Sequence, residues 1–340
     1  MEEPTKAARA SGLRYFSDAE PGIQRVSSGK RFRYLRSNGR VVRNQEVLKR
    51  IQSLAIPPAW TDVWICASPK GHLQATGRDA RRRKQFRYHP RWCAFRDESK
   101  YERVPQFAKC LAQMRQNIKK HLRLKGLPKE KVLATVVQLL ESTQIRVGNE
   151  EYAEQNHSYG LTTLRVRHVK IHGARMRFQF KGKSGVKHAI QLNDRQLARI
   201  VKQCQELPGQ ELFQYLDEEG RRHVIGSDDV NDYIRQISGG DFTAKDYRTW
   251  AGTVYAVKEL QHYQKFESER EAKENLNQAI QAVAKRLGNT RAVCRKCYIH
   301  TAVIEAYVDG HLLDVFPSST PRTNIMEKKL VRFLQRYRRL

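Results

Sequence analysis

Five polar side chains between residues 146 and 298 have the types needed to cut a phosphodiester bond without a metal ion. Tyr298 offers a phenolic nucleophile. Arg146, Lys183 and Arg248 offer the positive charge that a metal would otherwise supply. Asn289, nine residues before the tyrosine, adds a neutral N–H donor. Free tyrosine has a pKa of about 10, so neighbouring cations must favour its phenolate and stabilise the charge that develops on the nonbridging oxygens.

The oxygen that leaves phosphorus needs a proton, and a lysine in a turn can supply it. Apolar residues alternate over 176–180 and return at 189–192, on either side of the glycine-containing turn 181–185. This pattern predicts a β-hairpin with Lys183 near its tip. A lysine on a mobile hairpin is a sensible general acid, although a turn lysine on its own is ordinarily just exposed. Asn289 has no useful pKa, so we assign it no acid–base role.

Helix ends are predicted to position both arginines. Apolar residues recur at helical spacing over 131–145, and Gly148 ends the pattern just after Arg146. A helix end holds Arg146 firmly while leaving it able to face a ligand. Residues 243–246 resemble a capping box, so Arg248 falls in the opening turns of the helix that follows.

The other two site residues follow a further helix end. Gly288 is expected to end a helix over 276–287, directly before Asn289. A final helix over about 291–307 is predicted to carry Tyr298. Taken singly, each site residue has a commoner structural interpretation: a packed tyrosine, ion-paired arginines, or a helix-stop asparagine.

The order of elements predicts two domains and an α+β fold. Residues 1–91 open with a loose polar lead to about residue 20, followed by short apolar segments, turns and one helix at about 44–54. We expect this part to be a small, mainly antiparallel β domain. Residues 92–340 are predicted to form a larger, mostly helical catalytic domain with a small β-hairpin sheet.

The net charge of +29 over 340 residues indicates an anionic partner, and nucleic acid is the first candidate. A membrane is a weaker candidate, because the sequence shows no long apolar stretch, basic amphipathic anchor or export signal. Six scattered cysteines suggest reduced thiols in the cytoplasm. Cys294 and Cys297 form an isolated pair, and structural zinc usually needs four ligands, so we expect no metal site.

Positive charge and aromatic rings are concentrated in residues 78–91, where seven residues are Lys or Arg and one is acidic. Cations suit phosphates, and glutamine can hydrogen-bond a base edge. A plain solvated charge run is the alternative. We predict that the segment contacts DNA through Arg78, Arg81, Arg82, Arg83, Lys84, Gln85, Phe86 and Tyr88.

The motifs along nearly the whole chain resemble those of type IB DNA topoisomerases of the compact poxvirus-like group, particularly the bacterial members. Each motif alone is weak, but several in the right order leave little room for a chance match. They are Ile56-Pro57-Pro58-Ala59-Trp60, Gly77-Arg78-Asp79-Ala80, Arg146-Val147-Gly148-Asn149-Glu150, Lys181-Gly182-Lys183, Asp246-Tyr247-Arg248-Thr249-Trp250 and Arg295-Lys296-Cys297-Tyr298.

This resemblance implies a role for each candidate site residue. Tyr298 matches the family's nucleophile, and Lys183 matches the general acid of its hairpin loop. Arg146 and Arg248 match its two catalytic arginines. Asn289 stands where the poxvirus enzymes have histidine, as in the bacterial branch.

The resemblance also implies DNA contacts in the N-terminal part and beyond it. Gln85, Phe86 and Tyr88 match a segment that contacts DNA near the cleavage site, and Tyr152 matches a further contact. Phe86 replaces a tyrosine of the viral enzymes, so a phenol hydrogen bond is lost and the preferred target site can differ.

The implied activity is relaxation of supercoiled double-stranded DNA through a transient 3′-phosphotyrosyl nick, which the 5′ hydroxyl reseals. Neither ATP nor a metal is expected, since the sequence shows no P-loop pattern and no acidic cluster typical of magnesium sites. We expect a cytoplasmic, nucleoid-associated monomer whose two domains close around the duplex.

Two alternatives stay open at the level of sequence. A tyrosine recombinase shares the nucleophile, the arginines and the covalent intermediate. Recombinases usually show His-x-x-Arg before the second arginine, whereas this chain has Lys245 three residues before Arg248. The other alternative is a non-enzymatic DNA-binding protein.

Overall fold

The computed structural model describes residues 2–28, 31–80, 82, 84–263, 265–318 and 323–337. Its contacts divide the chain into two compact units, Met1–Lys100 and Tyr101–Leu340. Helix α3 (Pro90–His121) runs through the boundary between them. The division into domains of residues 1–91 and 92–340 stays a prediction, and its limit falls in the first turn of this helix.

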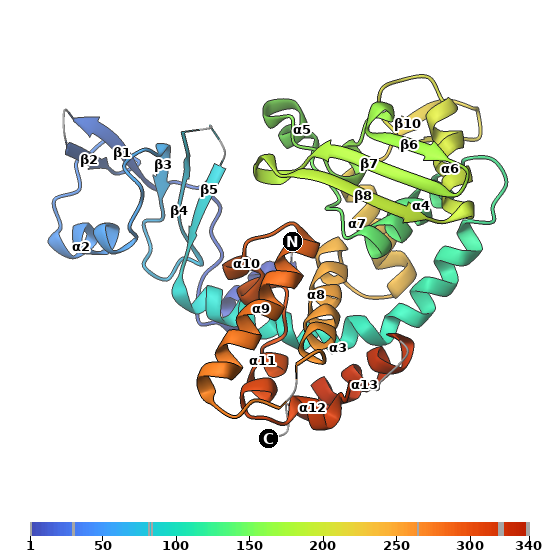
Figure 1. Ribbon diagram of the computed structural model, residues 1–340. Helices are drawn as coiled ribbons and strands as arrows, with labels where there is room; N and C mark the ends of the chain where they lie inside the picture. The colour runs from blue at the N-terminus through green and yellow to red at the C-terminus, as the bar shows by residue number, and fades with distance from the viewer. Residues whose placement is uncertain are drawn as a thin grey trace. The chain divides into compact units, whose positions relative to one another are not determined.

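The first unit is built on one antiparallel sheet (Figure 1). Its strands lie in the order β2-β1-β3-β4-β5. In chain order the elements are α1 (Glu2–Ala10), β1 (Ile23–Ser28), β2 (Arg31–Leu35), α2 (Gln45–Ser53), β3 (Thr61–Ile65), β4 (Leu73–Arg78) and β5 (Lys84–Tyr88).

The helix predicted at about 44–54 is confirmed as α2. Asn44 caps it, with Oδ1 accepting a hydrogen bond from the backbone N–H of Val47 at 3.0 Å. Ile51 of this helix packs into a small core together with Ile23 of β1 and Ile65 of β3. The helix therefore covers one face of the sheet.

The prediction of a loose lead up to residue 20 was wrong, because α1 forms there. Ala8 and Leu13 are buried in a cluster with Trp92. The apolar partner comes from a distant part of the chain, so local composition did not reveal it.

The second unit joins two small antiparallel sheets to a larger set of helices (Figure 1). One sheet has the order β6-β7-β8, and the other pairs β9 with β10. The strands are β6 (Val169–His172), β7 (Arg175–Lys181), β8 (Lys187–Asn193), β9 (Gln214–Leu216) and β10 (Arg222–Val224). The helices after α3 are α4 (Lys129–Thr143), α5 (Glu150–Asn156), α6 (Arg195–Glu206), α7 (Ser227–Ser238), α8 (Ala244–Leu260), α9 (Glu269–Leu287), α10 (Arg291–Cys297), α11 (Thr301–Val308), α12 (Leu312–Val315) and α13 (Thr323–Arg336).

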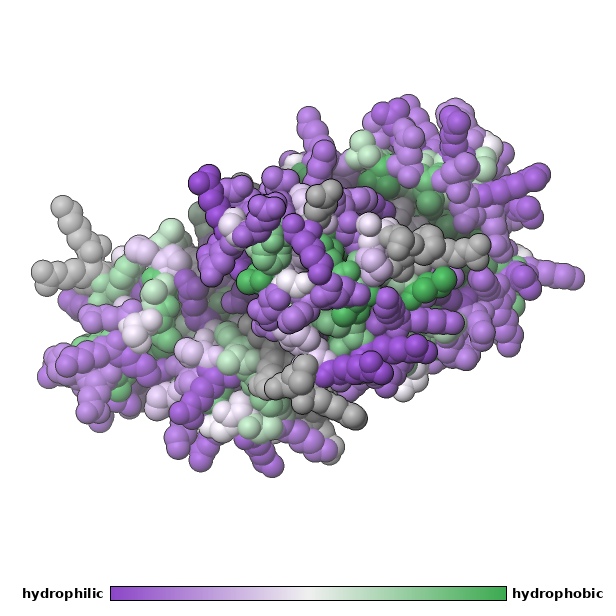
Figure 2. All heavy atoms as spheres, turned by 60° about the horizontal axis from the view of Figure 1, so that its bottom comes forward, coloured by the Kyte–Doolittle hydropathy of each residue, from purple (hydrophilic) through white to green (hydrophobic). Residues whose placement is uncertain are grey.

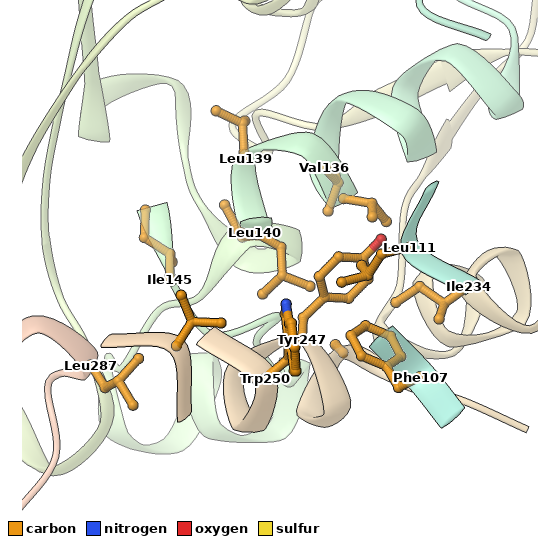
Figure 3. Packing of buried hydrophobic residues seen from close by; sticks show 14 of the residues in the cluster. Phe107, Leu111, Val136, Leu139, Leu140, Ile145, Ile234, Tyr247, Trp250 and Leu287 are labelled. Atoms are coloured by element: carbon orange, nitrogen blue, oxygen red, sulfur yellow. The ribbon is translucent and has the colours of Figure 1, made fainter. Parts of the chain in front are cut away.

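Helices α3, α4 and α8 meet in the main core of this unit (Figure 3). Phe107 of α3 meets the ring of Tyr247 of α8 edge-on, with ring centroids 4.9 Å apart. Leu140 of α4 and Leu287 of α9 are buried in the same core. Burial of these faces fixes the ends of α4, α8 and α9, where candidate site residues lie. The predicted α+β class is confirmed.

Helix α13 is attached to the core through the guanidinium of Arg115 in α3. This guanidinium donates to both carboxylate oxygens of Glu327, at 2.9 and 3.1 Å, and to Glu141 at 2.7 Å. The two carboxylates raise the pKa of Arg115 against the opposing effect of burial. A planar guanidinium can hold two carboxylates at once, so α3, α4 and α13 are joined at one point.

The single helix predicted over about 291–307 was wrong, because the chain forms two helices, α10 and α11, with a break at 298–300. Ile299 is fully buried, and His300 caps α11 by accepting a hydrogen bond from Ala302 N–H at 3.1 Å. The backbone N–H of His300 in turn donates to Oγ1 of Thr253 in α8 at 3.1 Å. Partners on α8 thus stabilise the break and leave Tyr298 at the end of α10.

Hydrophilic side chains cover most of the face drawn in Figure 2, and hydrophobic ones form small separate groups. Within the described parts of the chain, every helix is too short or too polar for a membrane span.

Candidate active site

A cavity of about 430 Å³ in the second unit brings together four of the five predicted site residues. Arg146, Lys183, Arg248 and Tyr298 line it, although they come from four separate elements. The fifth, Asn289, lies behind this lining in contact with Arg146. Residues separated by about 150 positions in the sequence therefore meet at one surface.

Arg248 is the most deeply buried member of the site, with 4% of its surface exposed. Its Nη2 donates to the carbonyl of Leu287 at 2.7 Å, and its Nη1 donates to the carbonyl of Gln144. The Nε atom is buried and makes no hydrogen bond within the described residues. The guanidinium carbon lies 5.2 Å from the centroid of the Tyr298 ring. Burial lowers the pKa of Arg248, and the nearby tyrosine partly offsets that effect; arginine stays charged nonetheless.

Arg146 follows α4 and reaches the end of α9. Its Nη2 donates to the carbonyl of Gly288 at 3.0 Å and to Oδ1 of Asn289. Its own carbonyl accepts a hydrogen bond from Leu161 N–H at 2.8 Å. A side chain at Gly160 would lie 2.6 Å from that carbonyl oxygen, so only glycine fits there. Burial and the positive charge of the second arginine lower the pKa of Arg146. Two guanidinium groups held this close favour an anion between them.

Asn289 directly follows Gly288, which ends α9 in the left-handed conformation with φ +59°. The predicted helix stop is thus confirmed. The Oδ1 atom accepts from Arg146, so the amide is oriented with Nδ2 away from that arginine. Nδ2 is buried and lacks an oxygen or nitrogen acceptor among the described residues. The amide lies next to the thiol of Cys294, and burial raises the pKa of that thiol to about 11.

Tyr298 lies at the end of α10, and its backbone is held on both sides. Its N–H donates to the carbonyl of Cys294 at 2.9 Å. Its carbonyl packs directly on α8, where a side chain at Gly252 would lie only 2.3 Å from the oxygen. Two residues earlier, the carbonyl of Lys296 accepts a hydrogen bond from the hydroxyl of Tyr101 at 2.8 Å. The position of the phenol therefore depends on α3 and α8 as well as on α10.

Lys183 lies in the turn between β7 and β8, and the predicted hairpin is confirmed. The side chain is exposed and lines the cavity. The N–H of Gly182 donates to the carbonyl of Val186 at 2.8 Å and closes the turn. Ser184 has φ +62°, a conformation found mostly in tight turns. The hairpin thus brings an exposed amine to the edge of a site in which Arg248 is buried and Arg146 is half-buried.

Two models of known protein families match this chain. A model of the eukaryotic DNA topoisomerase I catalytic core matches residues 84–311. A model of the bacterial DNA topoisomerase IB N-terminal domain matches residues 31–79. The chain belongs to the type IB DNA topoisomerase family.

Individual relatives agree with this assignment. DNA topoisomerase 1B of Acanthamoeba polyphaga mimivirus is 32% identical over 84% of this chain and 87% of its own length. DNA topoisomerase I of Monkeypox virus is 23% identical over 79% of this chain and 85% of its own. DNA topoisomerase 1B of Vaccinia virus (strain Western Reserve) is 22% identical over the same shares. The tyrosine recombinase alternative is not favoured.

The basic segment of this topoisomerase-family chain lies in the first unit, around β5. Lys84, Phe86 and Tyr88 are exposed on the same side of the strand, and the two rings stack with centroids 5.9 Å apart. Gln85 faces the other side and donates to Asp79 at 3.0 Å. These aromatic and charged groups form a surface that suits a nucleic acid, and the segment's contacts with DNA stay a prediction.

The other predicted DNA contacts differ in how far the structure describes them. Arg78 donates to the carbonyl of Arg82 at 2.9 Å, so it supports the turn before β5. Arg81 and Arg83 lie outside the described residues. Tyr152 is in α5, and its side chain is likewise outside the described part.

Three residues near the site were missed by sequence reasoning: Tyr101, His188 and Gly252. Tyr101 and Gly252 act through contacts distant in sequence, which no local pattern reveals. His188 had a signal, since the alternation that turns Ile190 inward also turns His188 inward. In the described parts of the chain, no group of three or more His, Cys, Asp or Glu side chains is arranged to hold a metal.

Proposed function

We propose that this chain relaxes supercoiled duplex DNA as a type IB topoisomerase, with Tyr298 as the nucleophile and neither ATP nor a metal as a participant. The observation that carries the proposal is the cavity that Tyr298 shares with two arginines and a lysine. Family membership supports the reaction class. The residue roles are our assignment.

In the first step the phenol of Tyr298 loses its proton to water, and the phenolate oxygen attacks the phosphorus of one strand. A bond forms between that oxygen and phosphorus, and the bond to the 5′ oxygen breaks. The guanidinium of Arg248, 5.2 Å from the ring centroid, is positioned to stabilise negative charge near the phenol. The strand is then held as a 3′-phosphotyrosyl ester, which keeps the energy of the broken bond.

Both arginines are assigned to the nonbridging oxygens of the phosphate. Backbone carbonyls already orient Arg146 and Arg248, so little reorganisation is needed when charge develops. Arg248 keeps a buried, unsatisfied Nε–H available for this purpose. Asn289 contributes by orienting Arg146, since its Oδ1 accepts from that arginine while its Nδ2 is buried behind the cavity lining. Charge-assisted hydrogen bonds to phosphate are stronger than neutral ones.

Lys183 is assigned to the proton that the 5′ oxygen needs as it leaves. Its ammonium gives up a proton to that oxygen, and the amine takes the proton back when the 5′ hydroxyl attacks the phosphotyrosine. Between the two steps the free end swivels and releases supercoils of either sign. The exposed turn allows the lysine to approach a bound strand from outside the arginine pair.

We also propose that duplex DNA is held by charge, with the chain acting as a cytoplasmic, nucleoid-associated monomer. The net charge of +29 supports an affinity that falls steeply as salt rises. In the first unit, we assign DNA contacts to three of the described residues, Lys84, Phe86 and Tyr88.

The test is relaxation of positively and negatively supercoiled plasmid in EDTA without ATP, together with trapping of the covalent adduct by denaturant. We expect relaxation of both signs, and an adduct that maps to Tyr298. Tyr298→Phe should bind DNA normally and form no adduct. Relaxation that takes place only when magnesium is added, or an adduct on a residue other than Tyr298, would contradict the mechanism.

A further inference from the structure

The side chain of His188 fills the space between the lysine turn and the end of α9. It projects from β8, directly opposite Phe180 of β7, and its ring stacks on that phenylalanine at 4.9 Å between centroids. The interplanar angle is 20°, so the ring is held flat against the hairpin. His188 is half-buried, unlike Lys187 and Ala189 on either side, which are exposed.

On one side the His188 ring touches the backbone of the residue before Lys183. A side chain at Gly182 would lie 2.6 Å from both Cδ2 and Nε2 of the imidazole. Real Cβ atoms are essentially never that close to other heavy atoms, so the ring lies directly against the glycine. The φ of Gly182 is −95°, which suits any residue, so the closeness of His188 is what excludes a side chain.

On the other side the same ring touches the residue before Asn289. A side chain at Gly288 would lie 2.7 Å from Cε1 of His188. The carbonyl of Gly288 accepts the hydrogen bond from Arg146 at 3.0 Å. One imidazole therefore separates the turn that carries the lysine from the backbone that orients an arginine.

We propose that His188 is a positioning residue that sets the place of Lys183 relative to the arginine pair. It acts as a spacer of fixed thickness between Gly182 and Gly288. This inference rests on the proposed role of Lys183. The start of the exposed turn is also held by a hydrogen bond from Tyr159 N–H to the carbonyl of Lys181 at 2.8 Å, and the His188 ring adds a packing contact on the side that faces Gly288.

The electrostatic surroundings favour a neutral spacer. Burial lowers the pKa of His188, and the charges of Arg146 and Arg248 lower it further. A neutral ring can pack beside two guanidinium groups, whereas a third cation there would be repelled.

The test compares His188→Ala with Gln191→Ala. Gln191 lies on the same strand, is exposed, and pairs opposite Arg177, so it is the matched control. Single-turnover cleavage is measured on a duplex with the normal 5′ oxygen and on one with a bridging 5′ sulfur, which leaves without a proton. Thermal unfolding and DNA binding in a Tyr298→Phe background are measured alongside, because a general folding defect would change both.

For the oxygen substrate we expect His188→Ala to slow cleavage by about 10- to 100-fold, since general acids typically contribute about 10²- to 10⁴-fold. With the sulfur substrate the rate should return to within about threefold of the unsubstituted chain. Gly182→Ala should give the same pattern, because its new Cβ pushes the turn away from the ring. The control should match the unsubstituted chain on both substrates.

The double variant Lys183→Ala with His188→Ala separates this inference from the proposed role of the lysine. If His188 acts through Lys183, the double variant is no slower than Lys183→Ala alone. Multiplicative defects, or an unchanged rate for His188→Ala, would overturn the inference. If the sulfur substrate fails to rescue Lys183→Ala while the double variant is still no slower than Lys183→Ala alone, the general-acid role of the lysine is excluded. The positioning role of His188 is then still supported.

Discussion

Substitution of Gly252, which lies 46 residues before Tyr298 in the chain, should disable the nucleophile. A Cβ built at this position lies 2.3 Å from the carbonyl oxygen of Tyr298, whereas ordinary contacts begin at 3.4 Å. In Gly252→Ala the tyrosine backbone must therefore move by about 1 Å. A misplacement of that size costs on the order of 100-fold in rate. The helix itself should tolerate alanine, which is more favourable than glycine in a helix by about 1 kcal/mol.

The assay for Gly252→Ala is single-turnover formation of the covalent adduct, with DNA affinity and the unfolding midpoint measured on the same samples. We expect adduct formation to fall by about 100-fold while DNA affinity is unchanged. Gly226→Ala is the matched control, because its φ is −91° and an added Cβ would make an ordinary contact at 3.5 Å. Adduct formation within about threefold of the unsubstituted chain would show that Tyr298 does not rest against α8 when it reacts.

Three further predictions concern the supports of the site and of the fold. Tyr101→Phe removes the hydrogen bond to the nucleophile segment, so adduct formation should slow by about fivefold, as expected for about 1 kcal/mol; an unchanged rate would mean that this bond does not position the tyrosine. Glu327→Gln takes a charged partner from Arg115 and should lower the stability to urea by about 2 kcal/mol, while relaxation by the folded protein persists; equal stability would argue against this attachment of α13. Burial lowers the pKa values of His72 and His168 below 6.5, so the unfolded chain takes up protons first as pH falls. The contribution of these two histidines to the free energy of unfolding is complete above pH 6.5 and is lost on acidification. The thermal unfolding midpoint should therefore be lower at pH 5.5 than at pH 7.5; a higher midpoint at pH 5.5 would contradict this reasoning.

Several site elements were predictable because their signals are local. Gly288 ends α9 in a left-handed conformation, as a glycine after a helical pattern indicates. Asp246 accepts a hydrogen bond from the N–H of Thr243 at 2.8 Å, as the capping-box pattern indicates, and Arg248 lies early in α8. The alternating residues around Lys183 form the predicted hairpin. In each case the residues that decide the structure lie within a few positions of one another.

The features that sequence reasoning missed depend on partners distant in the chain. The break after Tyr298 is stabilised by Thr253 of α8, so helical periodicity alone predicted an unbroken helix. Helix α1 packs through Ala8 into a cluster with Trp92, about 80 positions later. The inward turn of His188 followed from strand alternation, but its place between two glycines depends on the approach of α9 to the hairpin. Periodicity predicts which face is buried, and it does not predict what lies against that face.

The two carbonyl contacts of Arg248 give this side chain a second duty. Its Nη atoms join the last residue of α9 to the residue that ends α4, while the Nε–H has no partner among the described residues and each Nη keeps a second hydrogen. A lysine at this position concentrates its donors on one nitrogen and cannot span two carbonyls and a phosphate as a planar guanidinium does, so the swap is not conservative. A substitution of Arg248 is therefore expected to disturb the junction of α4 with α9 and the reaction together, and hardly any residue type could replace it in one role while preserving the other.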